Sequence, residues 1–110
     1  MKTQKIKKQL TTKSGLIIPS GSMVTIKPLP EMPTRTLIIF NEIKVVIPTI
    51  GLSNYFDGFL KLDKIEKMRK KLINFETDSS VVKSMTNQNV EPDGYDPDGF
   101  PSILLALGLI

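Results

Sequence analysis

The residues best suited to chemistry lie near the end of the 110-residue sequence, in the segment EPDGYDPDGF, residues 91–100. Its carboxylates belong to Glu91, Asp93, Asp96 and Asp98. Carboxylates at alternate positions ahead of a glycine are typical of a calcium loop, which also needs a glutamate at its twelfth position. If Gly99 takes the sixth position, the first is Gly94 and the twelfth is Leu105, and neither side chain binds calcium. Because Pro-Asp-Gly is common in tight turns, we expect these residues to shape turns, with calcium binding as the alternative.

Composition excludes most other kinds of catalytic or metal site. The sequence has no Cys and no His, which excludes disulfides, zinc and haem sites built from these residues, and thiol or imidazole catalysis. Two carboxylates can act as general acid and base when they face each other across a cleft, but these four share one Gly- and Pro-rich loop. We therefore predict that the protein is not an enzyme and holds no cofactor or metal. An enzyme that uses Asp93, Asp96 or Asp98 with a divalent ion is a third hypothesis.

Lysines gather near the start of the sequence and in residues 61–71. The chain has 15 basic and 11 acidic residues, a formal net charge of +4, and its only arginines are Arg35 and Arg69. Lysines can neutralise the phosphates of nucleic acid, but arginine is the usual residue for base-edge contacts. Neither cluster has aromatic side chains between its lysines, so neither offers a stacking platform. The candidate interaction residues are Lys5, Lys7, Lys8, Lys67, Lys70 and Lys71.

The two ends of the sequence carry opposite charge. Residues 1–13 contain five lysines and no acid, whereas residues 91–98 contain four acids and no base. Such segregation can be satisfied within one fold, or it can set head-to-tail contacts between copies in an assembly. Asp93, Asp96 and Asp98 are therefore also candidate interaction residues.

The length fits one domain, which we divide into four segments. Residues 1–13 form a basic N-terminal arm whose first positions are loose, with a first strand entered from Gln9. Residues 14–60 form a β-rich core, and residues 61–86 form a helical segment packed on it. Residues 87–110 form an acidic loop and an apolar C-terminal tail.

The β-rich core is predicted from runs of β-branched residues broken by turn residues. Residues 14–27 indicate a strand, a type I turn at Pro19-Ser20-Gly21 and a second strand. Residues 28–33 contain three prolines and predict an extended connection. Residues 36–40 and 43–47 predict a hairpin through Asn41-Glu42. Because its apolar residues fall on both faces, we expect this hairpin to be covered on both sides or curled into a barrel.

Helical spacing of apolar residues predicts a helix over 61–75, and a second short helix is expected over 78–86. We also expect a short 3₁₀ turn around residues 52–56, and Pro101 at the first position of a final helix. The apolar tail must be buried in its own core or against another chain, which makes Leu104, Leu105 and Leu107 candidate interaction residues. The predicted core comprises Ile17, Val24, Ile26, Leu37, Ile39, Val45, Ile47, Phe56, Ile65, Met68 and Leu72.

Targeting signals are not evident in the sequence. The longest apolar run covers residues 103–110, and a membrane span needs about 20 residues. The basic N-terminal residues are not followed by an apolar stretch of the kind found in signal peptides. We therefore expect no membrane span and no secretion signal, and a location in the cytoplasm of a host cell or in a virion.

The order of elements in the first half of the chain resembles an SH3-like small β-barrel. The resemblance depends on residues 14–26, the hairpin around Asn41-Glu42 and the turn near residues 52–56. It covers about the first half of the chain and implies a small antiparallel curled sheet or barrel there. With the helices and the apolar tail expected above, the predicted fold is α+β, in which this sheet is followed by an amphipathic helix, a short second helix and an apolar C-terminal segment. Domains of that fold commonly bind peptides, nucleic acid or neighbouring subunits. The ending EPDGYDPDGFPSILLALGLI is similar in style to the tails of small bacteriophage or mobile-element proteins.

Two functional hypotheses follow from these residues. The first is a basic, non-enzymatic protein-interaction or structural module, such as a bacteriophage virion component or host-interaction factor, whose partner is another protein or copies of itself in an oligomer. The alternative is a small-barrel nucleic-acid-binding protein that uses the lysine-rich arm and helix. We expect no small-molecule substrate in either case.

Overall fold

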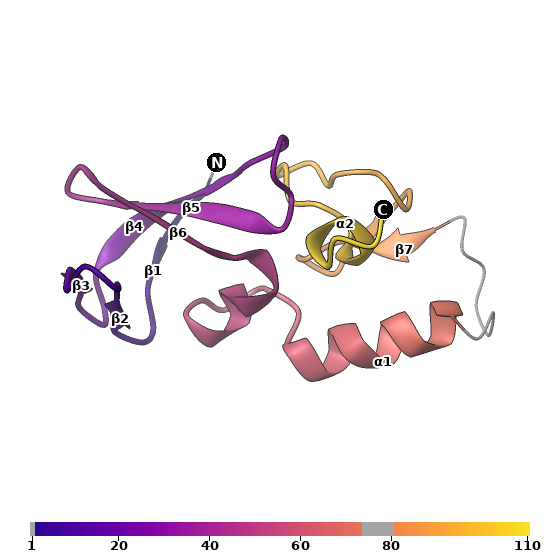
Figure 1. Cartoon of the computed structure of the whole chain (residues 1–110), viewed down its shortest axis with the longest axis horizontal. Coiled ribbons are helices and arrows are strands. Elements are labelled where there is room, and N and C mark those ends of the chain that lie inside the picture. Colours follow the sequence, from indigo (N-terminus) through magenta and orange to yellow (C-terminus); the bar gives the residue numbers. More distant parts are fainter. Residues whose placement is uncertain (1, 74–80) are drawn as a thin grey trace.

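The computed structural model describes residues 2–73 and 81–110 of the chain, with the side chains of Leu72 and Ile73 left out. The fold is α+β, with an antiparallel sheet at one end and helices beside it (Figure 1). The strands are β1 (Lys2–Lys5), β2 (Leu10–Thr11), β3 (Ile17–Ile18), β4 (Met23–Pro28), β5 (Arg35–Phe40), β6 (Ile43–Pro48), β7 (Val82–Lys83) and β8 (Asn89–Val90). The helices are the 3₁₀ helix η1 (Thr49–Asn54) and the α-helices α1 (Leu62–Ile73) and α2 (Ile103–Ala106).

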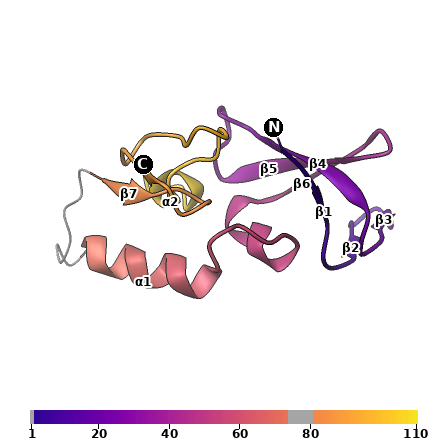
Figure 2. The ribbon, with the colours of Figure 1, turned by 180° about the vertical axis from the view of Figure 1, so that it is seen from behind.

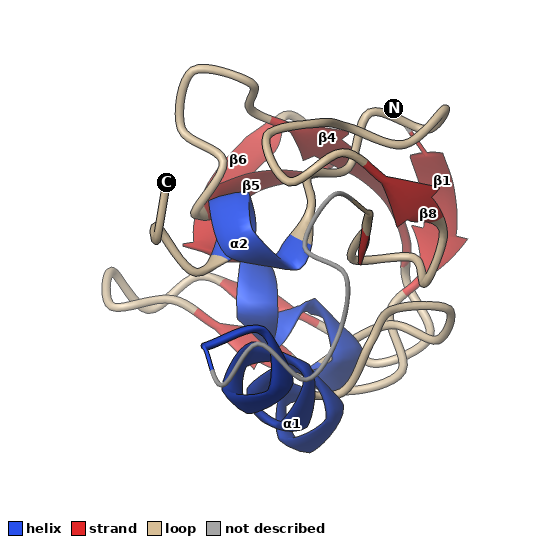
Figure 3. Cartoon of the chain, turned by 90° about the vertical axis from the view of Figure 1, so that its right-hand side faces the viewer, coloured by secondary structure: helices blue, strands red, loops and turns tan. Residues whose placement is uncertain are grey.

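The main sheet has four antiparallel strands in the order β1-β4-β5-β6. Seen from its side, it forms an arc with α1 and α2 on the concave side (Figure 3). The arc is not closed into a barrel, because β1 and β6 remain as its two edges. The predicted antiparallel α+β fold is therefore confirmed, while the barrel closure implied by the SH3-like resemblance is absent from this sheet.

The hairpin predicted at residues 36–47 is confirmed as β5 and β6. Phe40 pairs with Ile43, so Asn41 and Glu42 form the two-residue link. Both link residues have positive φ angles, 47° at Asn41 and 70° at Glu42, as a type I′ turn requires. Asparagine adopts this left-handed conformation readily, whereas glutamate does so at a cost.

Replacing Glu42 with glycine is expected to raise the free energy of unfolding by about 0.5–1 kcal/mol, because glycine has no Cβ to strain at positive φ. Urea unfolding followed by circular dichroism measures the change. Asn41→Gly is the matched control and should alter stability less, since asparagine already tolerates its φ angle. A loss of stability in Glu42→Gly would contradict the assignment of strain to Glu42.

Three predictions about the first 35 residues were wrong. The N-terminal residues are not a loose arm, because Lys2–Lys5 pairs with β4 as an edge strand. The two strands predicted in residues 14–27 are present as β3, which pairs with β2, and β4. The turn between them is not type I, because Gly21 lies at its third position with φ 85°. Residues 28–33 are not extended, since the N–H of Met32 bonds to the carbonyl of Leu29 and closes a turn.

The helical predictions were partly right. Helix α1 begins and ends within the predicted range 61–75, although residues 74 and 75 lie outside the described residues. Of the predicted second helix, residues 78–80 also lie outside the description, and Val82–Lys83 instead forms strand β7, which pairs with β8. The 3₁₀ helix begins earlier than predicted, at Thr49. The final helix begins at Ile103 rather than at Pro101, and the hydroxyl of Ser102 caps it by accepting the N–H of Leu105.

The core lies between the concave side of the sheet, η1, α1 and the C-terminal segment. Of the predicted core residues, Val24, Ile26, Ile47, Phe56 and Ile65 are buried. Val45 and Met68 are partly buried against them, and the side chain of Leu72 lies outside the description.

The core prediction was wrong by one residue in two strands. Ile17 is 52% exposed and Ile18 is buried in its place. In β5 the buried aliphatic residue is Ile38, while Leu37 and Ile39 lie on the other face and are half-buried. Both strands are apolar at consecutive positions, so the sequence alone does not show which face turns inward.

The C-terminal segment packs on the core of its own chain. Figures 1 and 2 both place α2 and β7 alongside α1, at the end of the sheet. Ile103 and Ala106 of α2 are buried. The N–H of Met85 bonds to the carbonyl of Pro101, and the N–H of Leu60 bonds to the carbonyl of Met85. Neither described α-helix is long and apolar enough to cross a membrane.

Candidate interaction surface on the outer face of the sheet

The convex side of the main sheet, which we call the outer face, carries basic residues on all four strands. The strand register places Lys5 beside Met23, Lys27 beside Leu37 and Lys44 beside Ile39. The basic residues of the outer face are Lys5, Lys27, Arg35 and Lys44, and all four are exposed. None of the four strands contains an acidic residue, so this face is positively charged along its whole width.

The middle of the outer face is aliphatic. Met23 is 56% exposed and Val46 is 50% exposed, and between them Leu37 and Ile39 are half-buried. Leu37, Ile39 and Val46 belong to the second apolar face of the hairpin noted in the sequence. The expected cover on both sides is not found, because the helices described here lie on the concave side (Figure 3).

Two buried threonines fix the end of β5 where Arg35 lies. The hydroxyl of Thr49 donates to the carbonyl of Pro33 at 2.8 Å, so the hydroxyl of Thr36 must donate to Thr49 Oγ1, also at 2.8 Å. This network ties the start of β5 to the first residue of η1. It holds Arg35 next to Pro48, at the end of β6.

A groove of about 670 Å³ follows the open edge of β6. Residues 44–48 line it consecutively, so it follows the edge of the strand rather than one face. The hairpin of β2 and β3 forms the other wall, with Lys13 and Leu16. Arg35 and Lys44 also line it, and no acidic residue does. The groove is therefore a basic continuation of the outer face around its edge.

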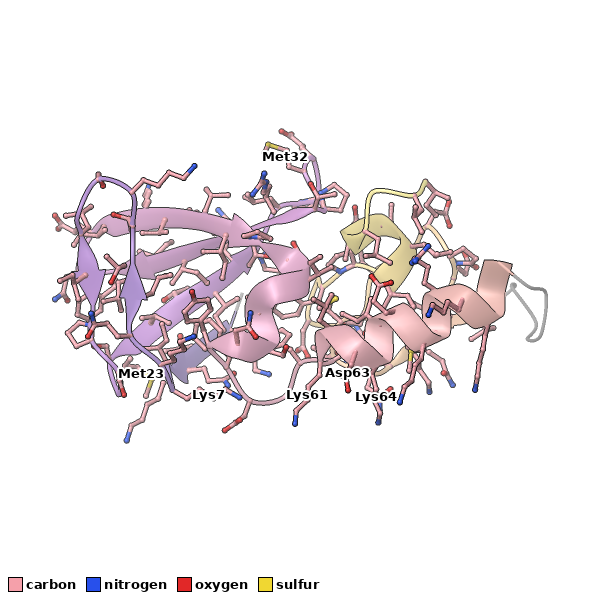
Figure 4. All side chains as sticks on the ribbon, turned by 60° about the horizontal axis from the view of Figure 1, so that its bottom comes forward. Lys7, Met23, Met32, Lys61, Asp63 and Lys64 are labelled. Carbon is pink, nitrogen blue, oxygen red and sulfur yellow. The ribbon has the colours of Figure 1, made fainter. Side chains whose placement is uncertain are left out.

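The predicted N-terminal lysines do not act as one cluster. Lys5 lies on the outer face. Lys7 forms an ion pair with Asp57 at 3.2 Å, and the ammonium of Lys8 lies 5.9 Å from the centre of the Tyr55 ring. Figure 4 shows Lys7 projecting from the same side of the molecule as Lys61 at the start of α1.

Helix α1 carries a second basic surface. Lys64, Lys67 and Lys71 are exposed and lie on one side of the helix, because residues three and four apart are neighbours on its surface. On a different side, Arg69 pairs with Glu66 at 3.0 Å. Lys70 is exposed near the helix end, where lysine is favourable to the helix dipole.

The acidic loop is built around one buried carboxylate. Asp96 is only 5% exposed, and its Oδ2 accepts hydrogen bonds from the hydroxyls of Ser84 and Thr86. Its Oδ1 accepts the N–H groups of Asp98 and Phe100 at 3.0 and 2.9 Å. All four bonds come from the protein itself, so Asp96 shapes the turn, as expected for Pro-Asp-Gly sequences.

The other acidic residues of the loop face solvent. Asp93, Asp98 and Glu91 are exposed, while Asp96 points inward, so the structure does not bring the predicted aspartates together. Within residues 2–73 and 81–110, no group of three or more acidic side chains is close enough to hold a metal ion.

The C-terminal leucines are only partly available for a partner. Leu104, Leu105 and Leu107 are half-buried, and Leu107 packs against the core. Leu109 is 49% exposed and Ile110 is 61% exposed. Most apolar side chains of the tail therefore pack against the rest of the same chain.

Sequence reasoning missed three residues of the outer face, namely Lys27, Arg35 and Lys44. Each stands alone among apolar or polar neighbours in the sequence, so none forms a visible cluster. Alternation within a strand could have placed each one on a face, but only the register between strands joins them. Searches of protein-family models, curated proteins and solved structures gave no match for this chain.

Proposed function

We propose that this chain is a non-enzymatic protein-interaction module whose outer face binds an acidic surface of another protein. The observation that carries the proposal is the outer face itself: basic residues on all four strands surround exposed aliphatic side chains, with no acid among them. Such a module would suit a virion component or host-interaction factor of a bacteriophage, the setting that the C-terminal sequence resembles.

Charge and shape favour a protein partner on this face. Complementary charge speeds encounter and fixes orientation, while an apolar centre within a polar rim is the usual anatomy of a protein interface. The face has no aromatic side chain among its central residues, so it lacks the stacking surface that single-stranded nucleic acid uses. Two copies would repel each other if they met face to face, because both faces are basic.

The first test reverses the charge of the outer face. A variant with Lys27→Glu, Arg35→Glu and Lys44→Glu should lose at least about tenfold in affinity for a partner captured by the unaltered protein. The captured protein is identified by mass spectrometry, purified and titrated against the variant by calorimetry. Binding of the unaltered protein should weaken with added salt, as expected for exposed charges.

The matched control is a helix variant with Lys64→Glu, Lys67→Glu and Lys71→Glu, which changes the net charge by the same amount. It should keep the partner that the outer-face variant loses. Equal loss in both variants would contradict a role specific to the outer face, and a partner that proves to be a second copy would contradict the choice of another protein.

The basic side of α1 supports the alternative function, nucleic-acid binding. Lys64, Lys67 and Lys71 share one side of the helix, and Lys7 projects from the same side of the molecule as the start of α1 (Figure 4). If this surface contacts several phosphates, affinity for a DNA or RNA duplex should fall steeply between about 50 and 200 mM salt. The helix variant should then lose that binding, and the outer-face variant should keep it.

A further inference from the structure

We propose that the groove along β6 accepts an extended acidic segment of the partner, which adds to the main sheet as a fifth strand. This inference rests on the proposed function and specifies how the partner is bound. The groove of about 670 Å³ is within the range of ligand-binding clefts, and the six residues of β6 span about 20 Å.

The hydrogen-bond pattern of the hairpin shows which backbone groups face the groove. Pro48 has no N–H, and the N–H of Thr49 bonds to the carbonyl of Thr34. Hydrogen-bonded pairs alternate along an antiparallel ladder, so Val45 and Ile47 direct their backbone groups to β5. Lys44 and Val46 therefore direct their N–H and carbonyl groups to the open edge.

These edge groups are unused by the rest of the described chain. No backbone hydrogen bond joins residues 44–47 to a segment other than β5. A row of free donors and acceptors on an edge strand is a template for another strand, and strand addition is a common way to bind extended peptides. The free groups of Lys44 and Val46 provide the affinity that side-chain charge alone would not.

The side chains around the groove define the segment that fits. Successive side chains of an added strand alternate between the two faces of the sheet. On the outer face they would meet Lys44 and Arg35, which favour glutamate or aspartate. On the inner side they would face Leu16 and Val45, which favour aliphatic residues. The expected segment therefore alternates acidic and aliphatic side chains.

Charge also selects against a second copy of the same edge. Lysine and proline on an edge strand discourage pairing between identical chains, and both are present here as Lys44 and Pro48. Two β6 edges would bring like charges together, whereas an acidic strand removes that repulsion. The edge of β6 therefore favours an acidic strand from another protein and disfavours the β6 edge of a second copy.

The test titrates the full chain with a peptide of about seven residues that alternates glutamate and valine, followed by NMR. We expect shifts at residues 44–48 and slower hydrogen exchange at the amides of Lys44 and Val46. Val46→Pro should weaken binding by at least about tenfold, because it removes an edge donor while leaving the bonds to β5 in place. Val46→Thr keeps the N–H and should weaken binding by less than about threefold.

A second peptide keeps the test decisive if Val46→Pro disturbs the fold. Methylating the peptide nitrogens that would bond to β6 should abolish binding to the unaltered protein, and a peptide that alternates lysine and valine should not bind. If the methylated peptide and Val46→Pro both leave binding unchanged while the outer-face variant loses it, strand addition is wrong and the proposed function stands. If the glutamate peptide does not bind at all, the inference is overturned, whereas the capture test with the outer-face variant still decides the proposed function.

Discussion

Replacing Asp96 with alanine is expected to lower the free energy of unfolding by about 3–5 kcal/mol. The substitution removes the acceptor for the hydroxyls of Ser84 and Thr86 and for the N–H groups of Asp98 and Phe100. The N–H of Phe100 is buried and has no other partner among the described residues. Leaving buried donors unpaired costs more than the net gain of forming their bonds, which is why the loss is large. Urea unfolding, followed by circular dichroism, measures it.

Asp98→Ala is the matched control for Asp96→Ala. Asp98 lies two residues away in the same loop, but its side chain is exposed, and only its backbone N–H bonds to Asp96. Stability should therefore change by no more than about 0.5 kcal/mol. Equal effects in the two variants would mean that loss of loop charge, rather than loss of the buried hydrogen bonds, determines stability.

The second large effect is expected at Phe100, where substitution by alanine should cost about 3–5 kcal/mol. Its side chain is completely buried, and its ring lies edge-on to Phe59 with 5.0 Å between centroids. Phe59 lies edge-on in turn to Phe56, at 6.3 Å. A cavity at this position would remove the contact between the C-terminal loop and the residues that follow η1. Thermal and urea unfolding would both report the loss.

Tyr95→Phe provides the comparison for Phe100→Ala. Tyr95 is 39% exposed, and its hydroxyl donates to the carbonyl of Pro30 at 3.1 Å. Loss of that one exposed bond should cost no more than about 1 kcal/mol. If Phe100→Ala lowered the free energy of unfolding by no more than Tyr95→Phe does, packing among the rings of Phe56, Phe59 and Phe100 would not contribute substantially to stability.

The hairpin of β5 and β6 could be predicted because its signals are local. Two β-branched runs lie on either side of Asn41-Glu42, and a two-residue link allows few turn geometries. The inward face of β4 was also predictable, since only Val24 and Ile26 alternate there with more polar residues. Helix α1 was predictable from the spacing of Ile65 and Met68. In each case the information lies within a few residues of the element.

The missed elements depend on distant partners. Lys2–Lys5 contains no aliphatic residue and becomes a strand because β4, about twenty residues later, supplies its hydrogen bonds. Val82–Lys83 is a strand only because Asn89–Val90 returns beside it. The burial of Asp96 was hidden for the same reason, since its hydroxyl partners Ser84 and Thr86 precede it by ten residues or more.

The candidate site was the least predictable part of the chain. Sequence clustering directed attention to Lys7 and Lys8, whose side chains contact Asp57 and Tyr55. Of the predicted lysines, Lys5 alone lies on the outer face. Lys27 and Lys44 join it through the register of three strand pairs, and register follows from which face is buried. A composition count cannot show that positive charge is gathered on one side of a sheet.

The backbone bridge at Met85 has a consequence for how the protein is made. The backbone of Leu60 is hydrogen-bonded to Met85, and Met85 is hydrogen-bonded to Pro101. The contacts of Leu60 therefore depend on residues that the ribosome adds up to about forty positions later. Domains generally fold as units during or after synthesis. Until Phe100 and Ile103 have been added, the concave side of the nascent sheet therefore lacks part of its apolar cover. A chaperone that binds exposed apolar surface would therefore find the most of it before Phe100 and Ile103 have been added.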